Sequence, residues 1–428
     1  MIKQAFIGID LGTSGCRIIA IDEDKKPLLE LKSDLPPSQR NATGHSRQNP
    51  EDWWQVVLQL LHTCARELKD YRPVAIAVDG TSSTLLLTDS SGSPLTPALM
   101  YDDPSARNFT DRIAQVADPQ SSVHSAGSSL AKLLYLADQT GGDSVRHVMH
   151  QADWISGRLC GRHGFSDENN CLKLGYDAVN RCWPEWMEGF GFPLAWLPEV
   201  FPAGTDIGSL APEVARELGY PADTRVVTGT TDSTAAVLAS GIRQPGQALT
   251  SLGSTLVLKI LSDTPLSSPE HGIYSQRLGD LWLVGGASNS GGAVLRQLFN
   301  DEEIERLTHS IDPDSETGLD YYPLPASGER FPVNDPELPP RLSPWPEDDA
   351  HFFQGILEGI ADIETAGYRL LQALGAPHLV EVFSIGGGAV NKPWRLIRER
   401  KLGVPVHRCD HQQAAFGSAR LARSSALR

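Results

Sequence analysis

The pattern of apolar and polar positions predicts ordered segments near both ends of the chain. Two β-branched, apolar strands are predicted within residues 5–21, and a tight turn at Asp10–Gly15 joins them. Apolar residues recur at helical spacing over residues 53–68, which predicts an amphipathic helix. A short buried strand over 74–78 follows, and it ends in the segment Asp79-Gly-Thr-Ser-Ser-Thr84. Strand, helix and strand in this order indicate an α/β architecture.

Similar elements are predicted after an irregular, tryptophan-rich middle region. A strand that starts at Arg225 is predicted to end at Gly229, and Thr231 or Asp232 to cap a short helix. A hairpin is predicted over residues 248–261.

The last hundred residues combine a loop, a helix and a strand. Six prolines between Phe331 and Pro346 predict a long surface loop, because proline fits neither helix interiors nor sheet ladders. The clearest helical pattern covers residues 352–374. A strand over 380–385 runs directly into Gly386-Gly-Gly388.

Length and composition narrow the class of protein. At 428 residues the chain exceeds the size at which a single core stops growing, about 250–300 residues, so we expect two domains. The 37 basic and 53 acidic residues give a net charge of −16, which is unlike a protein that binds nucleic acid or an anionic membrane. The six cysteines are scattered and the N-terminus resembles no signal or transit peptide. No apolar run reaches the roughly 18 residues of a membrane span, so we expect a cytoplasmic protein.

Two glycine turns suggest a duplicated, phosphate-binding architecture. Leu11-Gly12-Thr13-Ser14 in the first hairpin matches Leu252-Gly253-Ser254-Thr255 in the later one. Backbone N–H groups and hydroxyls in such turns can hold phosphate without a helix N-terminus. Neither a Walker loop nor a Rossmann fingerprint is present. A plain β-turn that needs small residues is the structural alternative for each.

Three aspartates follow apolar strands and are candidates for catalysis. They are Asp10, Asp79 and Asp232. A carboxylate beside a hydroxyl substrate can act as a general base, and one beside phosphates can hold magnesium. The structural alternatives are a helix N-cap for Asp232 and a turn residue for Asp79.

Four motifs, taken in order, resemble the FGGY carbohydrate kinases. They are Phe6-Ile-Gly-Ile-Asp-Leu-Gly-Thr-Ser-Gly15, Val227-Thr-Gly-Thr-Thr-Asp-Ser233, Leu252-Gly-Ser-Thr255 and Gly386-Gly-Gly-Ala-Val-Asn391. The resemblance implies an α/β fold of two actin-like (ribonuclease H-like) domains around a central cleft. An N-terminal sugar-binding domain would cover 1–239, with 412–428 packing back on it, and an ATP-binding domain would cover 240–411. The implied partners are a small sugar and ATP with Mg²⁺, in a monomer or homodimer.

The resemblance also implies a role for each motif residue. Asp232 would be the general base, and Asp10 would help to hold the sugar and the magnesium ion. Other sugar contacts would come from Ser14, Gly15, Arg17 and Ser82, although Arg17 has the alternative of an exposed strand residue. ATP would contact two groups of residues: Gly12, Thr13, Ser14, Gly253, Ser254 and Thr255 near the phosphates, and Gly386, Gly387, Gly388, Ala389, Val390 and Asn391 near the adenosine.

The substrate is inferred from two segments that depart from family patterns. Asp79–Thr84 replaces the Met-His-Gly segment typical of xylulose kinases, and Met100–Asp103 replaces the Trp-Gln-Asp-Arg-like segment of glycerol kinases. The compact chain resembles the branch of the family found in cyanobacteria and plants, which implies D-ribulose as the substrate. D-Xylulose is the alternative, and an actin-like nucleotide-binding protein with only basal ATPase is an alternative of a different class.

Overall fold

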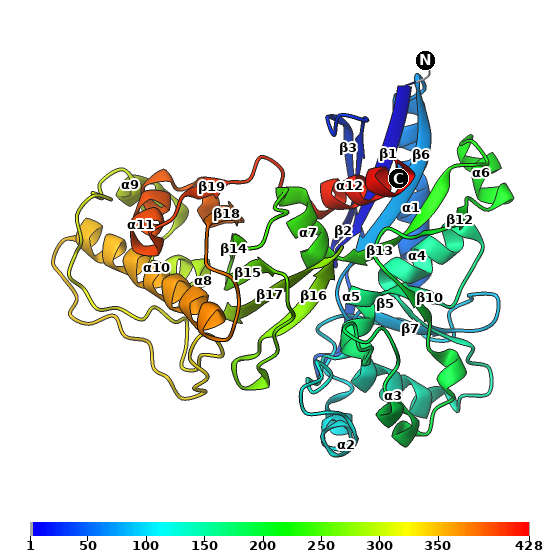
Figure 1. Ribbon diagram of the computed structural model, residues 1–428, viewed down its shortest axis with the longest axis horizontal. Coiled ribbons are helices and arrows are strands. Elements are labelled where there is room, and N and C mark those ends of the chain that lie inside the picture. Colours follow the sequence, from blue (N-terminus) through cyan, green and yellow to red (C-terminus); the bar gives the residue numbers. More distant parts are fainter. Residues whose placement is uncertain (1–2, 428) are drawn as a thin grey trace. The chain divides into compact units, whose positions relative to one another are not determined.

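The computed structural model describes residues 3–427, which form two units (Figure 1). The first unit runs as far as Ala239 and also includes the C-terminal segment that starts at Gln413. The second unit comprises Ser240–Gln412. Each unit contains its own six-stranded mixed sheet, so each is described separately.

The main sheet of the first unit has the strand order β12-β13-β6-β1-β2-β3. Strands β1, β6 and β13 are mutually parallel, and the other neighbouring strands are antiparallel. Their bounds are β1 Lys3–Leu11, β2 Gly15–Ile21, β3 Pro27–Asp34, β6 Tyr71–Gly80, β12 Asp206–Ser209 and β13 Arg225–Thr231. Because the three parallel strands point the same way, the residues that follow them meet at one edge of the sheet.

Helices cover both faces of this sheet because side chains alternate along β1. Ile7 belongs to the core beneath α1 (Pro50–Glu67), whereas Phe6 packs with residues of α12 (Ala414–Ala426). Helix α12 lies directly against β1 (Figure 1). Gly8 permits this approach, since a Cβ there would lie 2.0 Å from a backbone oxygen of α12.

The first unit also contains two smaller sheets and further helices. Two smaller sheets have the orders β4-β5-β8-β7-β9 and β10-β11. The strands are β4 Gln39–Arg40, β5 Ser46–Gln48, β7 Leu85–Thr88, β8 Ala98–Leu99, β9 His147–His150, β10 Phe165–Asp167 and β11 Glu199–Phe201. The helices are α2 Thr110–Val116, α3 Ser129–Thr140, α4 Gln151–Cys160, α5 Glu168–Cys171, α6 Pro212–Leu218 and α7 Asp232–Ser240, with 3₁₀ turns at Arg107–Phe109, Leu172–Leu174, Glu185–Phe190 and Leu194–Trp196.

The sheet of the second unit has the order β16-β17-β15-β14-β18-β19. Its strands are β14 Gln247–Leu252, β15 Leu256–Ser262, β16 Tyr274–Leu278, β17 Leu281–Ser288, β18 Glu381–Ile385 and β19 Val406–Arg408. The helices are α8 Gly292–Leu298, α9 Asp301–Thr308, α10 Asp349–Ala373 and α11 Lys392–Leu402, with 3₁₀ turns at Pro269–His271 and Gly387–Val390.

A buried ion pair joins the two longest helices of the second unit to its central strands. Arg398 of α11 donates two hydrogen bonds to the Glu364 carboxylate of α10, at 2.6 and 2.7 Å. Thr250 of β14 donates to the same carboxylate at 2.5 Å, and the guanidinium also donates to Ser384 of β18 at 2.9 Å. Both charged side chains are only 1% exposed. The pair therefore depends on its mutual hydrogen bonds rather than on water.

Most predicted elements are present, with one notable difference in β13. This strand continues to Thr231, two residues past its predicted end at Gly229. A Cβ at Gly229 would lie 1.6 Å from the carbonyl oxygen of Val78. The glycine thus marks a close approach of β13 to β6, and the prediction of a strand end was wrong.

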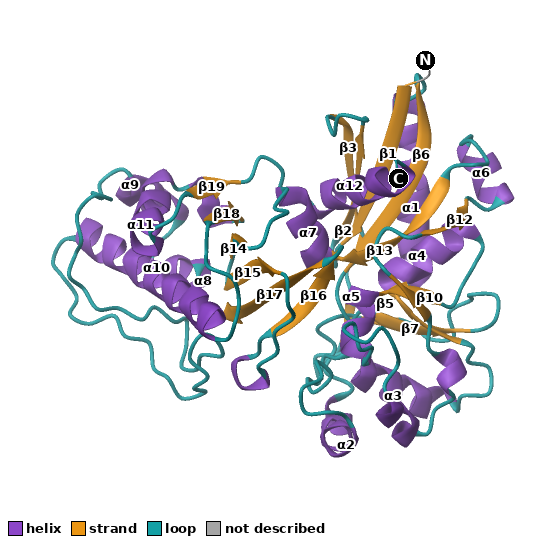
Figure 2. Cartoon of the chain, viewed as in Figure 1, coloured by secondary structure: helices purple, strands orange, loops and turns teal. Residues whose placement is uncertain are grey.

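The proline-rich segment forms no regular element. Between α9 and α10, over residues 309–348, the structure contains only isolated bridges such as Glu329 with Asp335 (Figure 2). Phe331 is nevertheless buried. The segment is thus a loop, as predicted, but one that is anchored by an aromatic side chain.

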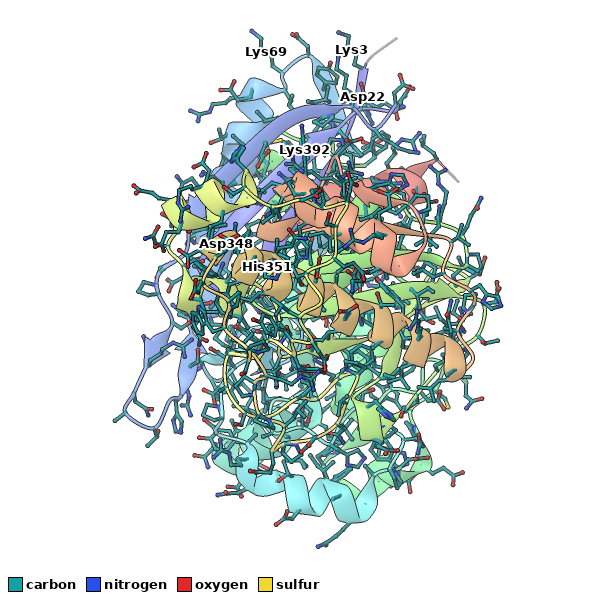
Figure 3. All side chains as sticks on the ribbon, turned by 90° about the vertical axis from the view of Figure 1, so that its left-hand side faces the viewer. Lys3, Asp22, Lys69, Asp348, His351 and Lys392 are labelled. Atoms are coloured by element: carbon teal, nitrogen blue, oxygen red, sulfur yellow. The ribbon has the colours of Figure 1, made fainter. Side chains whose placement is uncertain are left out.

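Many other charged side chains lie at the surface of each unit. Lys3 and Lys69 of the first unit are exposed, as is Lys392 of the second (Figure 3). No helix within residues 3–427 has the length and apolar character that a bilayer crossing requires.

Candidate active site

Three aspartates gather at the carboxyl edge of the first unit's sheet. Asp10 of β1 is the register partner of Asp79 of β6, and Asp79 in turn pairs in register with Thr230 of β13. Asp232 comes two residues later and begins α7. The three carboxylates therefore lie near the carboxyl ends of adjacent parallel strands, as expected for a ligand site in such a sheet.

Burial raises the pKa values of all three carboxyls, and the charge of Asp10 raises those of Asp79 and Asp232 further. Burial raises the pKa of Asp232 to about 6, a hydrogen bond from the Ser233 N–H opposes the shift, and the charge of Asp10 adds to it. The pKa of Asp79 is raised well above its usual range by complete burial and by the charge of Asp10. Burial also raises the pKa of Asp10, while a hydrogen bond with Asp79 and the Arg17 charge lower it. The pKa of Asp79 is therefore raised more strongly than that of Asp10.

Asp79 is fully buried and is the register partner of Asp10. Its side chain has no exposed surface, and its Oδ2 accepts a hydrogen bond of 2.6 Å from the Ser418 hydroxyl of α12. The sequence alone favoured a turn residue at this position. In the structure Asp79 lies inside the strand and interacts with Asp10, so the turn interpretation was wrong.

The turn after β1 is open to ligands. Gly12 donates its N–H to Gly15 O at 2.9 Å, which closes the hairpin, and Ser14 is exposed. The carbonyl of Thr13 accepts a hydrogen bond of 2.8 Å from the Gln48 side chain. Hydroxyls at the tip of this turn are thus available to oxygen-rich ligands.

Arg17 lies on β2, where its Nε is 3.3 Å from Glu30 of β3. Both side chains are partly exposed. Arg17 is also the register partner of Asp10 across the hairpin, and its charge lowers the pKa of that carboxyl.

The segment after β6 presents several hydroxyls beside the carboxylates. The Thr81 hydroxyl lies 2.5 Å from that of Thr84, and both the N–H and the hydroxyl of Thr81 donate to Gln151 Oε1 at 3.0 Å. Ser82 follows and is partly exposed. Sequence reasoning singled out Ser82 but missed Gln151, which lies 70 residues away and carries no motif.

A cavity of about 1130 Å³ lies in the second unit between its glycine turns and helices. Six of the predicted ligand residues line it: Gly253, Ser254, Gly387, Gly388, Val390 and Asn391. The other three predicted residues of this unit's turns, Thr255, Gly386 and Ala389, do not line it. Gly386 supports the wall instead, because its φ is +87° and a Cβ there would lie 2.8 Å from Leu252 O. The lining includes apolar side chains and a few polar groups, as in nucleotide-sized ligand pockets.

Asn391 organises the wall of this cavity. It caps α11 by accepting a hydrogen bond of 2.9 Å from Trp394 N–H, and its amide donates to the Thr308 hydroxyl at 3.0 Å. Trp394 is 1% exposed and donates its indole N–H to Leu357 O at 3.0 Å. The tryptophan therefore packs as a core residue that also borders the cavity.

Arg296 supplies positive charge to the cavity and was missed by sequence reasoning. It lies on α8 and donates to the Ser254 hydroxyl at 2.7 Å. A lone arginine in a short helix carries no motif, and only the fold brings it to the glycine turn.

The residues present fit ATP and magnesium by their chemistry. The glycine turns leave room for ligand atoms, and a Cβ at Gly387 would meet nothing within 4 Å. Magnesium in phosphotransfer sites is bound by one or two carboxylates together with phosphate oxygens. Asp10 provides such a carboxylate.

Comparison with known proteins identifies the family. The model of the N-terminal domain of the FGGY family of carbohydrate kinases matches residues 5–239, and that of the C-terminal domain matches residues 248–426.

This chain belongs to the FGGY family of carbohydrate kinases. It is 26% identical over 446 residues to xylulose kinase of Escherichia coli, covering 98% of this chain and 90% of the relative. Gluconokinase of Bacillus subtilis is 22% identical, with 91% and 81% coverage. As an FGGY member the chain is an ATP-using carbohydrate kinase, as predicted.

Solved structures of FGGY kinases share the fold. A "xyloylose kinase" from Brucella ovis superposes with a TM-score of 0.87 at 24% identity, covering 99% of this chain and 91% of that one. Xylulose kinase from Rhodospirillum rubrum gives a TM-score of 0.86 at 21% identity, with 98% and 89% coverage. At these identities the likeness concerns the fold alone, and it confirms the predicted pair of actin-like α/β domains.

Proposed function

We propose that the protein is an ATP-dependent pentulose kinase that phosphorylates the terminal hydroxyl of D-ribulose, giving D-ribulose 5-phosphate. The observation that carries this proposal is Asp232, a carboxylate with a pKa of about 6 beside the Asp10–Asp79 pair. A base with such a pKa is ionised at neutral pH yet basic enough to accept a proton. Free carboxylates, at about 4, are much weaker bases.

Asp232 acts as the general base in this proposal. It accepts the proton of the sugar hydroxyl while that oxygen bonds to the γ-phosphorus and the bond to ADP breaks. Asp10 orients the sugar and is the carboxylate to which a magnesium ion would bind. When bound, magnesium neutralises charge on the phosphates. Asp79 is the register partner of Asp10, and burial raises its pKa, so in this proposal Asp79 is protonated and adds no third negative charge.

The cavity of the second unit binds the nucleotide in this proposal. Gly253 and Ser254 would bind phosphate oxygens, and the glycines at 386–388 with Asn391 would lie at the adenosine end. Phosphoryl transfer demands mainly positioning and charge stabilisation. Gly12, Thr13 and Ser14 would provide hydroxyl and N–H groups to the transferred phosphate, whereas a Walker lysine is not part of this sequence.

The choice of sugar depends on the segment Asp79–Thr84. Ser82 is its partly exposed hydroxyl, and we assign it together with Ser14 and Gly15 to the ketose. D-Xylulose is the second candidate, because several relatives with 23–26% identity are xylulose kinases. The two sugars differ only in configuration at one carbon, so a single hydroxyl contact can separate them.

Coupled ADP release with magnesium ATP tests the proposal. D-Ribulose, D-xylulose, L-ribulose, sedoheptulose and glycerol are compared with a blank without sugar. We expect the strongest stimulation by D-ribulose, and a loss of about 10²–10⁴-fold in kcat for Asp232→Ala. Stimulation by D-xylulose alone would correct the substrate, and stimulation that survives in Asp232→Ala would refute the role of Asp232.

A further inference from the structure

A buried lysine donates a hydrogen bond to the backbone of the proposed sugar-binding segment. Lys132 of α3 has no exposed surface. Its ammonium donates to the carbonyl oxygens of Ser83 at 2.8 Å, Met100 at 2.7 Å and Tyr101 at 3.1 Å. An ammonium has three N–H donors, so these three carbonyls use all of them.

The three carbonyls belong to the two segments that distinguish this chain from related kinases. One segment is 79–84 and the other is 100–103, and Lys132 joins them at a single point. Gln151 in turn accepts two hydrogen bonds from Thr81, the residue before Ser82. Ser82 therefore lies between two anchored neighbours.

Ser83 is also in an unusual conformation. Its φ is +65°, in the left-handed region that residues other than glycine seldom adopt. The hydrogen bond from Lys132 to the Ser83 carbonyl holds the peptide in this orientation. Without the ammonium, the turn is free to relax toward a more ordinary conformation.

The ammonium is used for these carbonyls rather than for an ion pair. Within residues 3–427 no salt bridge to Lys132 is found, and the nearest attractive charges, Asp103 and Asp102, have other partners. Asp103 accepts the N–H of Ser46 at 2.6 Å, and Asp102 pairs with Arg40 at 2.6 Å. An apolar chain would fill the space at lower desolvation cost, so the charge points to a positioning role.

We propose that Lys132 is a positioning residue that fixes the Ser82–Ser83 turn against residues 100–103 and thereby sets the affinity for the ketose. This inference rests on the proposed function of the turn. It assigns to Lys132 no contact with the reacting atoms, so the sugar KM should respond to its loss much more than kcat.

The protonation state of Lys132 adds a distinctive pH dependence. Burial lowers its pKa to about 7. The negative charges of Asp103 and Asp102 oppose this shift, and the positive charge of Lys173 adds to it. Above this pH the neutral amine has two N–H groups for three carbonyls. The KM for the sugar should therefore rise above pH 7, while the KM for ATP stays constant.

Steady-state kinetics of Lys132→Met with D-ribulose and D-xylulose test the inference. Lys259→Met is the matched control, since Lys259 is a buried lysine of the second unit that donates to Gln276 at 3.2 Å. We expect the sugar KM of Lys132→Met to rise about tenfold, which corresponds to the loss of one hydrogen bond between the displaced turn and the sugar. The kcat should change less than about threefold. Its sugar KM should also lose the rise above pH 7, and Lys259→Met should keep the wild-type KM.

The outcomes separate this inference from the proposed function. A wild-type enzyme that no sugar stimulates refutes the proposed function, and the inference with it. An active wild type with an unchanged sugar KM in Lys132→Met refutes the inference alone. If Lys132→Met does not fold, the same kinetics are measured with Lys132→Gln and the pH profile of the wild type is recorded. A wild-type sugar KM that is constant from pH 6 to about 8.5 refutes the inference.

Discussion

Asp232 destabilises the folded first unit, and Asp232→Asn should therefore gain stability as it loses activity. The pKa of this carboxyl rises from 3.8 in the unfolded chain to about 6 in the fold. At 1.36 kcal/mol per pKa unit, the penalty reaches at most about 3 kcal/mol. Because the folded pKa is the higher one, the folded state binds more protons between pH 3.8 and 6, and stability falls with pH across that window. The full penalty is present above pH 6.

One feature of the structure reduces the expected gain in stability, and another helps to preserve it. Asp232 is partly exposed, so water screens part of the penalty. An asparagine at this position keeps an oxygen that can accept the hydrogen bond from Ser233 N–H, now 2.6 Å long. We expect a net gain of about 1–2 kcal/mol at pH 8, equivalent to a rise of about 2–8 °C in the melting temperature of a unit this size.

Thermal melting and sugar-stimulated ADP release measure the two effects on the same preparations. Asp70→Asn is the control, because Asp70 is exposed in the first unit and its replacement changes the net charge equally. Asp232→Asn should melt above both wild type and Asp70→Asn at pH 8, and the difference should shrink by about half at pH 5. The reasoning is refuted if Asp232→Asn melts no higher than Asp70→Asn, or if it retains wild-type turnover.

Two further predictions concern the base and the second unit. The kcat/KM for the sugar should fall about tenfold per pH unit below pH 6, because Asp232 must be ionised to accept a proton; a flat profile from pH 5 to 7 would contradict its role. Arg398→Met should cost about 3–5 kcal/mol in urea denaturation, because it leaves the buried Glu364 carboxylate without its cation. Arg395→Met removes a partly exposed pair with Glu399 and a hydrogen bond to Val406 O, and should cost about 1–2 kcal/mol. Equal losses in the two variants would count against the buried pair.

The sequence predicted local features that depend on neighbouring residues in the chain. Apolar periodicity located β1, β2, β14 and the long helix α10, because burial of one face imposes a repeat on the sequence itself. The glycine turns after β1 and β14 were visible for the same reason, since small residues permit the close backbone turns there. Four ordered motifs were enough to place the chain in its family.

Some errors came from residues whose meaning depends on a distant partner. Gly229 reads locally as the end of a strand, yet it is glycine because Val78 O lies against it. Asp79 resembles a turn residue in the local sequence, yet its neighbours in space are Asp10 and Ser418. Ser418 follows Asp79 by 339 positions in the chain. Neither contact leaves a periodic trace in the sequence.

The sequence by itself determined the fold class, the family and the positions of the carboxylates and glycine turns. Only the tertiary structure decided how the pKa values of those carboxyls are shifted, because desolvation and repulsion depend on what surrounds a group in space. It also decided that Arg296 lies at the glycine turn and that Lys132 holds the segment that bears Ser82. Short-range patterns record which face of an element is buried, whereas charge, hydrogen bonding and pKa are set by contacts between elements far apart in the chain.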